Sequence, residues 1–382
     1  MDFSFLVPGN ITVKRGGFAD IGKICAKYAD NIMVFRYGDA FFNSGVHDAL
    51  KKSMDAAGVK FHVYDHIDAE PSPDVINKAA KAIRDRGCNG GLAVGGGSPI
   101  DAAKAALALA PNGDDIMDYI EGFNPKPFAN KPLPLIAVPT TSGTGSECTK
   151  NAVITEKGKF KNSVRADAML PVYALLDAEL MTSVPKETTA ISGADCLCQL
   201  IEGYVSKFSE PFSDALTLYF SKTAYDNLPI AYNDGDNLDA RENMALAACA
   251  SGMAMANAGL GAAHGIAAGL GALTPLSHGL ICGVVLPYVM EFNIECGVWK
   301  YSDIAERITG KHYPNKEEGA KEAVELVRDL NQKIGLPENF ESYHFDKSMI
   351  PKIAEASMGS SMAKNPVSVT FEQCADIIKK IL

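Results

Sequence analysis

The sequence lacks the features that would direct it to nucleic acid or to an oxidising compartment. Its net charge is -10 and no basic stripe occurs, which excludes nucleic acid and an acidic membrane surface as natural partners. Nine cysteines, an odd number at irregular spacing, do not form a disulfide framework. The first residues carry neither a basic n-region nor a long apolar run, so we expect no signal peptide and a cytoplasmic location.

An uninterrupted apolar run is also missing. The Ala-, Gly- and Leu-rich segment near residues 245–290 is broken by Asn257, His264, Pro275 and His278, which favours a buried helix pair over a membrane span. Internal repeats and low-complexity tracts are absent as well. The G-x-G-x-x-G fingerprint does not occur, so an ordinary Rossmann site is not predicted.

The apolar pattern predicts two domains. A length of 382 residues exceeds the roughly 100–200 residues of one domain. Short apolar runs alternate with amphipathic segments in the first half, as in a parallel sheet, and helical periodicity takes over from Pro185. We therefore predict an α/β domain over residues 1–184 and an all-α domain over 185–382. The predicted strands are 31–35, 60–64, 91–94, 135–138 and 172–176.

Two loops at predicted strand ends have the composition of a nucleotide site. The first strand-to-helix turn begins Gly95-Gly96-Gly97-Ser98, where glycines allow close approach of a ligand, Ser98 can cap the helix, and the helix N-terminus attracts phosphate. The second loop, residues 139–147, is rich in glycine and hydroxyl groups that can donate to phosphates and ribose. A glycine-containing turn and a solvated surface loop are the plainer alternatives.

Two histidines and an acid indicate a metal site. His264 and His278 stand among Gly, Ala and Leu, where an imidazole needs a partner, and the alternative is that each is a satisfied core residue. Asp195 lies among Ala, Cys and Leu, where an unpaired carboxylate is costly. Gln199 and Glu202 follow on the same predicted helix. Imidazole and carboxylate together suit zinc or iron.

Taken together, these motifs resemble the iron-containing (group III, metal-dependent) alcohol dehydrogenase family, and the resemblance covers nearly the whole chain. It implies an N-terminal α/β dinucleotide-binding domain and an all-α C-terminal domain, the fold shared with dehydroquinate synthase. It also implies NAD(P), a divalent metal, and hydride transfer between nicotinamide and a small primary alcohol or aldehyde. The matching segments are Gly95-Gly96-Gly97-Ser98-x-x-Asp101-x-Ala103-Lys104, Pro139-Thr140-Thr141-x-Gly143-Thr144-Gly145-Ser146-Glu147, Asp195, His264 and Pro-x-x-His278-Gly.

The resemblance places the metal ligands at Asp195, His264 and His278, which would also be the catalytic residues, with a fourth position at Gln199. Family members that use iron usually have His at this fourth position, and many have another His where this chain has Ala268. Related glycerol dehydrogenases use an Asp/His/His zinc site. We therefore leave iron and zinc open, with Gln199 as a weak or outer ligand, and the proton donor undefined.

For the cofactor, the resemblance implies that the glycine loop holds the pyrophosphate and that Lys161 lies beside the ribose. Asp39 would bind the adenosine ribose of NAD, whereas Arg36 nearby could accept the 2′-phosphate of NADP, so NAD is favoured and NADP is possible. A homodimer or higher homo-oligomer is expected. The predicted cofactor residues are Asp39, Gly95, Gly96, Gly97, Ser98, Asp101, Thr140, Thr141, Thr144, Ser146 and Lys161.

Two other functions stay open at this point. A dehydroquinate synthase-like lyase would share the scaffold, NAD and a three-ligand metal, but it needs a basic cluster for a phosphorylated substrate, and none surrounds Asp195, His264 and His278. A non-catalytic paralogue would explain Gln199 as decay of the metal site. The retention of both nucleotide loops and of the three predicted ligands argues against it.

Overall fold

The computed structural model describes residues 3–36, 45–67 and 70–382 and separates into two compact units. One unit comprises residues 6–141 and 145–182, and the other comprises residues 1–5, 142–144 and 183–382. The main division therefore falls after residue 182, two residues before the boundary predicted from the sequence.

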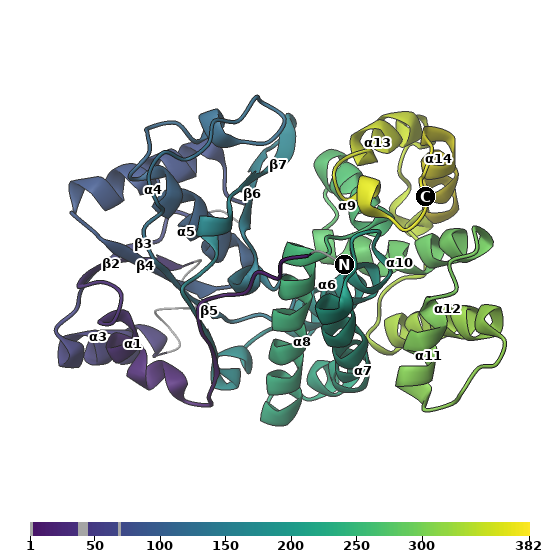
Figure 1. Ribbon diagram of the computed structural model, residues 1–382, viewed down its shortest axis with the longest axis horizontal. Coiled ribbons are helices and arrows are strands. Elements are labelled where there is room, and N and C mark those ends of the chain that lie inside the picture. The colour runs from purple at the N-terminus through teal and green to yellow at the C-terminus, as the bar shows by residue number, and fades with distance from the viewer. Residues whose placement is uncertain (1–2, 37–44, 68–69) are drawn as a thin grey trace. The chain divides into compact units, whose positions relative to one another are not determined.

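The first unit is built on a six-stranded sheet in which every paired neighbour is parallel (Figure 1). The predicted strands are all present, and the sequence missed the short edge strand β1, which pairs with β8. The strand order reverses between β2 and β4, the position at which open α/β sheets bind ligands. In the order β1-β8-β5-β4-β2-β3, the strands are Ile11–Val13, Tyr173–Leu176, Leu135–Pro139, Gly90–Gly95, Asn31–Arg36 and Lys60–Tyr64.

Helices cover both faces of this sheet. Helices α4 (Pro73–Asp85) and α5 (Gly97–Leu109) pack on the face that carries Met33, Phe35 and Ala93. Helices α1 (Ile21–Cys25) and α3 (Val46–Ala57) pack on the opposite face, which carries Ile32 and Val34 (Figure 1). Successive strand residues point to opposite faces, so a strand buried on both sides is apolar throughout.

A separate antiparallel hairpin joins the same unit. Strands β6 (Asn151–Glu156) and β7 (Phe160–Arg165) are linked by a tight turn in which Gly158 has φ of 77°. Glycine fits there because the left-handed region is open to it at no steric cost.

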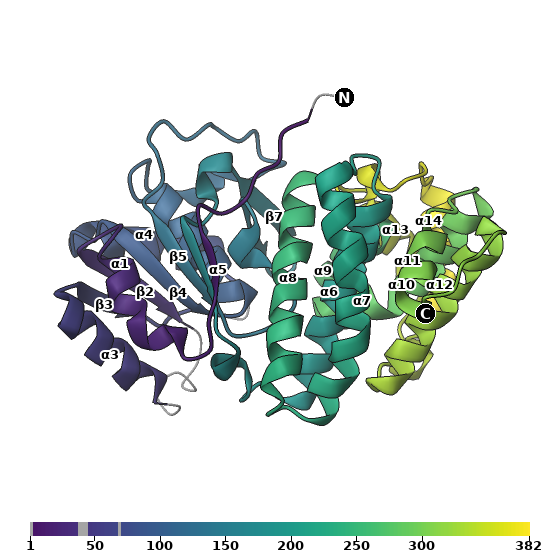
Figure 2. The ribbon, with the colours of Figure 1, turned by 60° about the horizontal axis from the view of Figure 1, so that its bottom comes forward.

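The second unit is helical, as predicted. Helices α6, α7 and α8 lie side by side (Figure 2), and α9 and α10 complete the core around them. Over the described residues, no single helix has both the length and the apolar content to cross a membrane, although the bent pair α8 and α9 meets both criteria together. The helices are α6 (Lys186–Val205), α7 (Pro211–Asn233), α8 (Leu238–Asn257), α9 (Ala262–Leu273), α10 (His278–Glu295), α11 (Tyr301–Thr309), α12 (Lys316–Lys333), α13 (Ile350–Ser357) and α14 (Phe371–Ile381).

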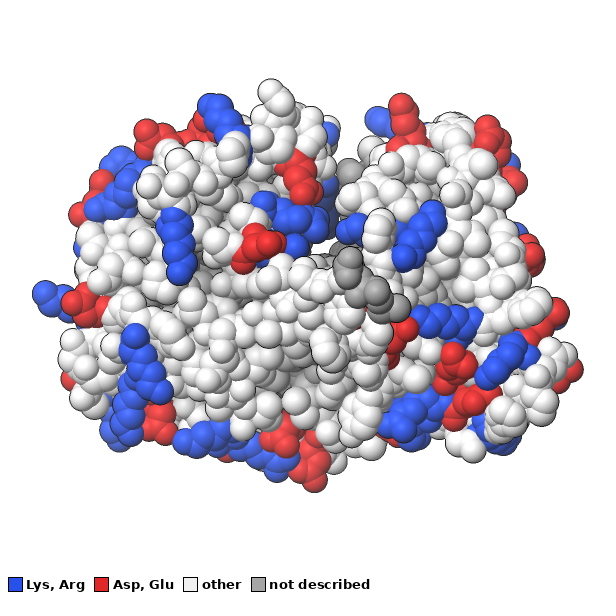
Figure 3. All heavy atoms as spheres, in the orientation of Figure 1, with Lys and Arg blue, Asp and Glu red and all other residues white. Residues whose placement is uncertain are grey.

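Two further features of the fold are the state of the cysteines and the distribution of surface charge. All nine cysteines lie in the described part of the chain, where none forms a disulfide, and eight of them are buried. On the face drawn in Figure 3, acidic and basic side chains are mixed over both units.

Candidate metal centre and nucleotide loops

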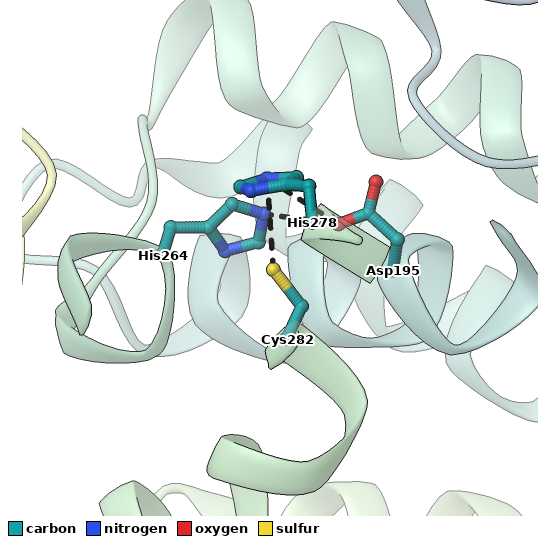
Figure 4. Close-up of side chains that lie close together, drawn as sticks. All are labelled: Asp195, His264, His278 and Cys282. Carbon is teal, nitrogen blue, oxygen red and sulfur yellow. Dashed lines mark hydrogen bonds and ion pairs between the residues drawn. The ribbon is translucent and has the colours of Figure 1, made fainter. Parts of the chain in front are cut away.

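Three helices of the helical unit bring four potential metal ligands together. Helix α6 supplies Asp195, α9 supplies His264, and α10 supplies His278 and Cys282, and the four side chains point toward one another (Figure 4). Asp195 Oδ1 lies 3.3 Å from His264 Nε2 and 3.9 Å from His278 Nε2. One ligand atom from each of the four residues lies within 4.8 Å of all the others. The structure therefore brings together the three ligands predicted from the sequence.

A glycine makes this convergence sterically possible. A Cβ atom on Gly279 would lie only 2.3 Å from the Ile191 carbonyl oxygen of α6, closer than non-bonded atoms approach. The first turn of α10 can therefore rest on α6 only with glycine at this position. Its neighbour in sequence, His278, is held beside Asp195 as a result.

Two buried ligand atoms of the cluster lack a hydrogen bond. Asp195 and His264 are 3% and 5% exposed. Among the described residues, Asp195 Oδ1 and His264 Nε2 make no hydrogen bond, although both atoms are buried. A buried polar atom without a partner is costly, and two such atoms that face each other mark a place for a ligand. A carboxylate with imidazoles is a donor set for zinc or iron, so the residues fit a divalent metal.

Glu202 orients the His264 ring from behind. Its Oε2 lies 2.6 Å from His264 Nδ1, and its Oε1 accepts from the Ala263 backbone N–H at 2.6 Å. We assign the ring proton to Nδ1, since an ionised carboxylate can only accept. Nε2, on the far side of the ring, then presents its lone pair toward Asp195. This is the arrangement by which outer carboxylates fix metal-binding histidines.

Gln199 contacts the cluster through its amide nitrogen. Nε2 donates to Asp195 Oδ2 at 3.0 Å, while Oε1 accepts from Ser251 Oγ of α8 at 2.7 Å. The amide oxygen is the only atom through which glutamine binds a metal, and here it is used by Ser251. Gln199 thus holds the carboxylate of Asp195 in place.

Burial and neighbouring charge act in opposite directions on this cluster. Burial would raise the pKa of the Asp195 carboxyl, but the adjacent His264 and His278 rings hold that pKa below its usual value. Burial would lower the pKa of His264, whereas the surrounding Cys282, Asp195 and Glu202 raise it well above its usual value. Burial also raises the pKa of the Cys282 thiol. The cluster thus attracts positive charge, which either a proton on His264 Nε2 or a cation in its place can supply.

Cys282 is the member of this cluster that the sequence did not reveal. It lies four residues after His278, so both side chains share one face of α10. That spacing was the available signal. A cysteine in an apolar helix is more often a small core residue, and only the packing of α10 on α6 and α9 distinguishes it.

The first predicted nucleotide loop follows β4. Gly95 has φ of 152°, and a Cβ there would lie 2.5 Å from Pro99 Cγ. A Cβ on Gly96 would lie 3.0 Å from Thr141 Oγ1, so the two glycines keep the backbone exposed beside the second loop. The prediction that Ser98 caps the helix is wrong, because α5 begins at Gly97 with Gly96 at the N-cap, and Ser98 lies in the first turn.

Two predicted cofactor residues belong to a buried polar network around Lys104. Lys104 Nζ donates to Ser146 Oγ, Thr149 Oγ1 and the Asn151 carbonyl oxygen, each at 2.7 Å, and lies 3.2 Å from Asp101 Oδ1. Ser146 Oγ also donates to Asp101. This network ties α5 to the second loop. Direct contact of Asp101 or Ser146 with a cofactor stays a prediction.

The remaining predicted cofactor residues are dispersed. Thr140 N–H donates to the Gly95 carbonyl oxygen at 3.0 Å, which joins the two loops, whereas Thr144 groups with the helical unit. Lys161, on β7, is ion-paired with Glu70 at 2.5 Å. Asp39 lies outside the described residues.

Comparison with known proteins agrees with this arrangement. The profile of the iron-containing alcohol dehydrogenases matches residues 8–178, and the C-terminal profile of the Fe-containing alcohol dehydrogenase family matches residues 189–382. The chain is 31% identical to the NAD-dependent methanol dehydrogenase of Bacillus methanolicus, over 99% of this chain and 100% of that protein. It is 30% identical to the NADPH-dependent butanol dehydrogenase of Clostridium saccharobutylicum, over 98% and 97%.

A solved structure of 1,3-propanediol oxidoreductase superposes with a TM-score of 0.94 at 28% identity and covers 100% of both chains. The matches define the class, a nicotinamide-dependent oxidoreductase that acts on alcohol groups. Within that class, the chain belongs to the iron-containing alcohol dehydrogenase family. Its α/β and helical units are the two domains of the family fold.

Proposed function

We propose that this enzyme interconverts small primary alcohols and aldehydes with NAD(H), using one divalent metal held by Asp195, His264 and His278. The observation that carries the proposal is the convergence of these three side chains with two buried ligand atoms left without hydrogen bonds. The substrate class follows the relatives, whose names specify methanol, butanol and propanediol.

The chain's own residues prepare the site for this chemistry. When bound, the metal polarises the carbonyl oxygen and stabilises the negative charge that develops there during hydride transfer. Glu202 keeps His264 in the tautomer that exposes Nε2, and Gln199 fixes the Asp195 carboxylate. Ala268 offers no proton, so water or a cofactor hydroxyl has to supply it.

The glycine loop after β4 would receive the cofactor. Gly95 and Gly96 leave room for the pyrophosphate at the N-terminus of α5, where free N–H groups and the helix dipole favour an anion. The reversal of strand order beside β4 supports this location.

Arg36 supports the preference for NAD. Its side chain is 3% exposed, and its Nη2 lies 3.0 Å from Asp65 Oδ2. A buried guanidinium that already has a carboxylate partner is poorly suited to receive a 2′-phosphate. We expect kcat/KM to be higher with NADH than with NADPH, and steady-state rates with both cofactors on one aldehyde test this.

Metal analysis combined with an NADH-oxidation screen over short aldehydes tests the proposed function. We expect one equivalent of iron or zinc, with activity lost on chelation and restored by the metal. Turnover that is undiminished in stripped protein would refute the role of the metal. Metal without activity toward any aldehyde or alcohol would favour the lyase, and neither metal nor turnover would favour a degenerate paralogue. The predicted homo-oligomer is tested by light scattering, and the cytoplasmic location by fractionation.

A further inference from the structure

We infer that the Sγ atom of Cys282 is a fourth protein ligand of this metal, in place of Gln199. The inference rests on the metal site of the proposed function and adds a thiolate to its donor set. Three observations carry it: the bonds of Gln199, the distances around Cys282, and the contrast with Cys198.

The position that the resemblance reserves for a fourth ligand is not directed at the metal. The amide nitrogen of Gln199 donates a hydrogen bond to Asp195 Oδ2, and its amide oxygen accepts one from Ser251 Oγ. Turning the amide to offer its oxygen to a cation would break both hydrogen bonds and leave the buried Ser251 hydroxyl with one partner fewer. The fourth donor therefore has to come from elsewhere.

Cys282 has the geometry of that donor. Its Sγ lies 3.6 Å from His278 Nε2. The other ligand atoms are separated by similar distances, with Asp195 Oδ1 lying 3.3 Å from His264 Nε2 and 3.9 Å from His278 Nε2. In a tetrahedral site with bonds of about 2.0–2.3 Å, neighbouring ligand atoms lie roughly 3.3–3.8 Å apart. Two of these three separations fall within this spacing, and the separation of Asp195 Oδ1 from His278 Nε2 is slightly longer. The Cys282 side chain is also fully buried, so its thiol is shielded from solvent.

A second cysteine nearby shows that proximity alone does not make a ligand. Cys198 is as buried as Cys282, and its Sγ lies 3.7 Å from His264. The contact is with Nδ1, however, the atom that faces Glu202. Cys198 is therefore behind the ring, while Cys282 lies on the Nε2 side of His278, where Asp195 Oδ1 is also found (Figure 4).

A thiolate changes which metal the site selects. Sulfur is a softer donor than the imidazole that iron-using relatives carry at the fourth position, and Asp, two His and Cys form a set suited to zinc. The replacement of His by Gln at 199 is then a transfer of the fourth ligand from α6 to α10, and the site remains complete.

Cobalt substitution tests the inference by a readout other than activity. Apoprotein loaded with one equivalent of Co²⁺ is expected to show the near-ultraviolet charge-transfer band of a thiolate–cobalt bond. The band should disappear in Cys282→Ser and persist in Cys198→Ser, the matched control. A cobalt-loaded parent without the band, or a band that survives Cys282→Ser, overturns the inference and leaves the proposed function standing. Failure to bind cobalt at all overturns both.

X-ray absorption on the parent protein loaded with zinc removes any dependence on the folding of a variant. One sulfur neighbour at about 2.3 Å is expected beside nitrogen and oxygen neighbours. A first shell with only nitrogen and oxygen would refute the thiolate ligand, whereas one sulfur would support it even if Cys282→Ser failed to fold.

Discussion

The two units each bury a charged side chain, and they treat it in opposite ways. In the α/β unit, the Lys104 ammonium has two hydroxyl groups, a backbone carbonyl and the Asp101 carboxylate around it. In the helical unit, Asp195 Oδ1 and His264 Nε2 face each other without a hydrogen bond. A buried charge that the chain itself satisfies is part of the scaffold. A buried carboxylate that keeps one oxygen without a hydrogen bond, among further ligand atoms, is where we propose that a cation binds.

Removal of Asp195 should have the largest effect, because it abolishes the site and not the scaffold. We expect Asp195→Ala to lose its metal and to reduce kcat/KM by roughly 10³-fold or more, since metal polarisation contributes several kcal/mol to transition-state stabilisation. Metal content by mass spectrometry and steady-state kinetics measure this. The melting temperature of the metal-free variant should not fall below that of metal-free parent.

The exposed Asp74 of α4 provides a control, since Asp74→Ala removes a surface ion pair with Lys78 and an acid from the first turn of α4, in the other unit of the molecule. It should keep metal and activity. An Asp195→Ala protein that retained stoichiometric metal would contradict the distinction between site and scaffold.

Lys104→Met should do the reverse, destabilising the α/β unit while the helical unit keeps its metal. Loss of one partner from a buried ion pair typically costs about 3–5 kcal/mol in the free energy of unfolding. We expect at most this cost here, because Asp101 keeps hydrogen bonds from Ser146 Oγ and the Val153 N–H. Hydrogen exchange resolved by segment would locate the loss around α5, β6 and the loop after β5. Lys81→Met, on an exposed pair with Asp85, should change stability little. Equal destabilisation of both units would argue that the two networks are not independent.

The same contrast explains what the sequence could predict. Strands β2, β4, β5 and β8 were predicted because each is an apolar run buried on both faces. The edge strand β3 was predicted from its apolar residues, although only Tyr64 is buried there, and the glycine loop was predicted because its residues are contiguous. Strand β1 was missed, since three residues at a sheet edge carry no periodic signal. Asp195, His264 and His278 stood out as polar residues in apolar segments. The sulfur ligand did not, because Cys282 is itself small and apolar in character.

The tertiary packing also decided the role of Gln199. From the sequence, its place four residues after Asp195 was compatible with a ligand on the same helix face. The bond to Ser251 depends on α8 packing beside α6, a contact between residues 52 positions apart. No local pattern encodes such a contact.

Glu147 provides a further test of the comparison within the α/β unit, because it is a buried acid near Lys104. Burial raises its pKa to about 7 from 4.5, against the opposing effect of Lys104. An acid with a raised folded-state pKa contributes stability below pH 4.5 that is lost as the pH rises through 7. Glu147→Gln, which carries no charge at any pH, should therefore gain stability relative to the parent above pH 7, by at most about 3 kcal/mol.

Thermal unfolding at pH 5 and pH 8 measures this gain as a difference between variant and parent. Glu156→Gln provides the control, because the Glu156 side chain is 37% exposed and should give no pH-dependent difference. A Glu147→Gln difference that is the same at both values of pH would show that the charge of Glu147 is compensated within the scaffold, as that of Lys104 is.

Glu202→Gln should have the smallest effect, because Glu202 touches the site only through His264. The variant amide has one oxygen and one nitrogen for two donors, the His264 Nδ1–H and the Ala263 backbone N–H. One of them must face an N–H group. Where that donor is the His264 Nδ1–H, His264 either rotates or moves its ring proton to Nε2. Either change removes the lone pair aimed at the metal, and loss of such an outer carboxylate typically costs 10–100-fold in metal affinity.

Competition with a chromophoric chelator would measure that affinity, and Glu187→Gln, the same chemical change on the exposed first turn of α6, is the matched control. The parent and the control should bind metal equally. Because Glu202 is uninvolved with Cys282 in this arrangement, the thiolate–cobalt band should persist in Glu202→Gln at saturating metal. A full loss of metal binding would instead place Glu202 in the metal's own coordination sphere. Glu202 would then belong to the groups that the chain leaves for a cation, and not to those that orient His264 by a hydrogen bond.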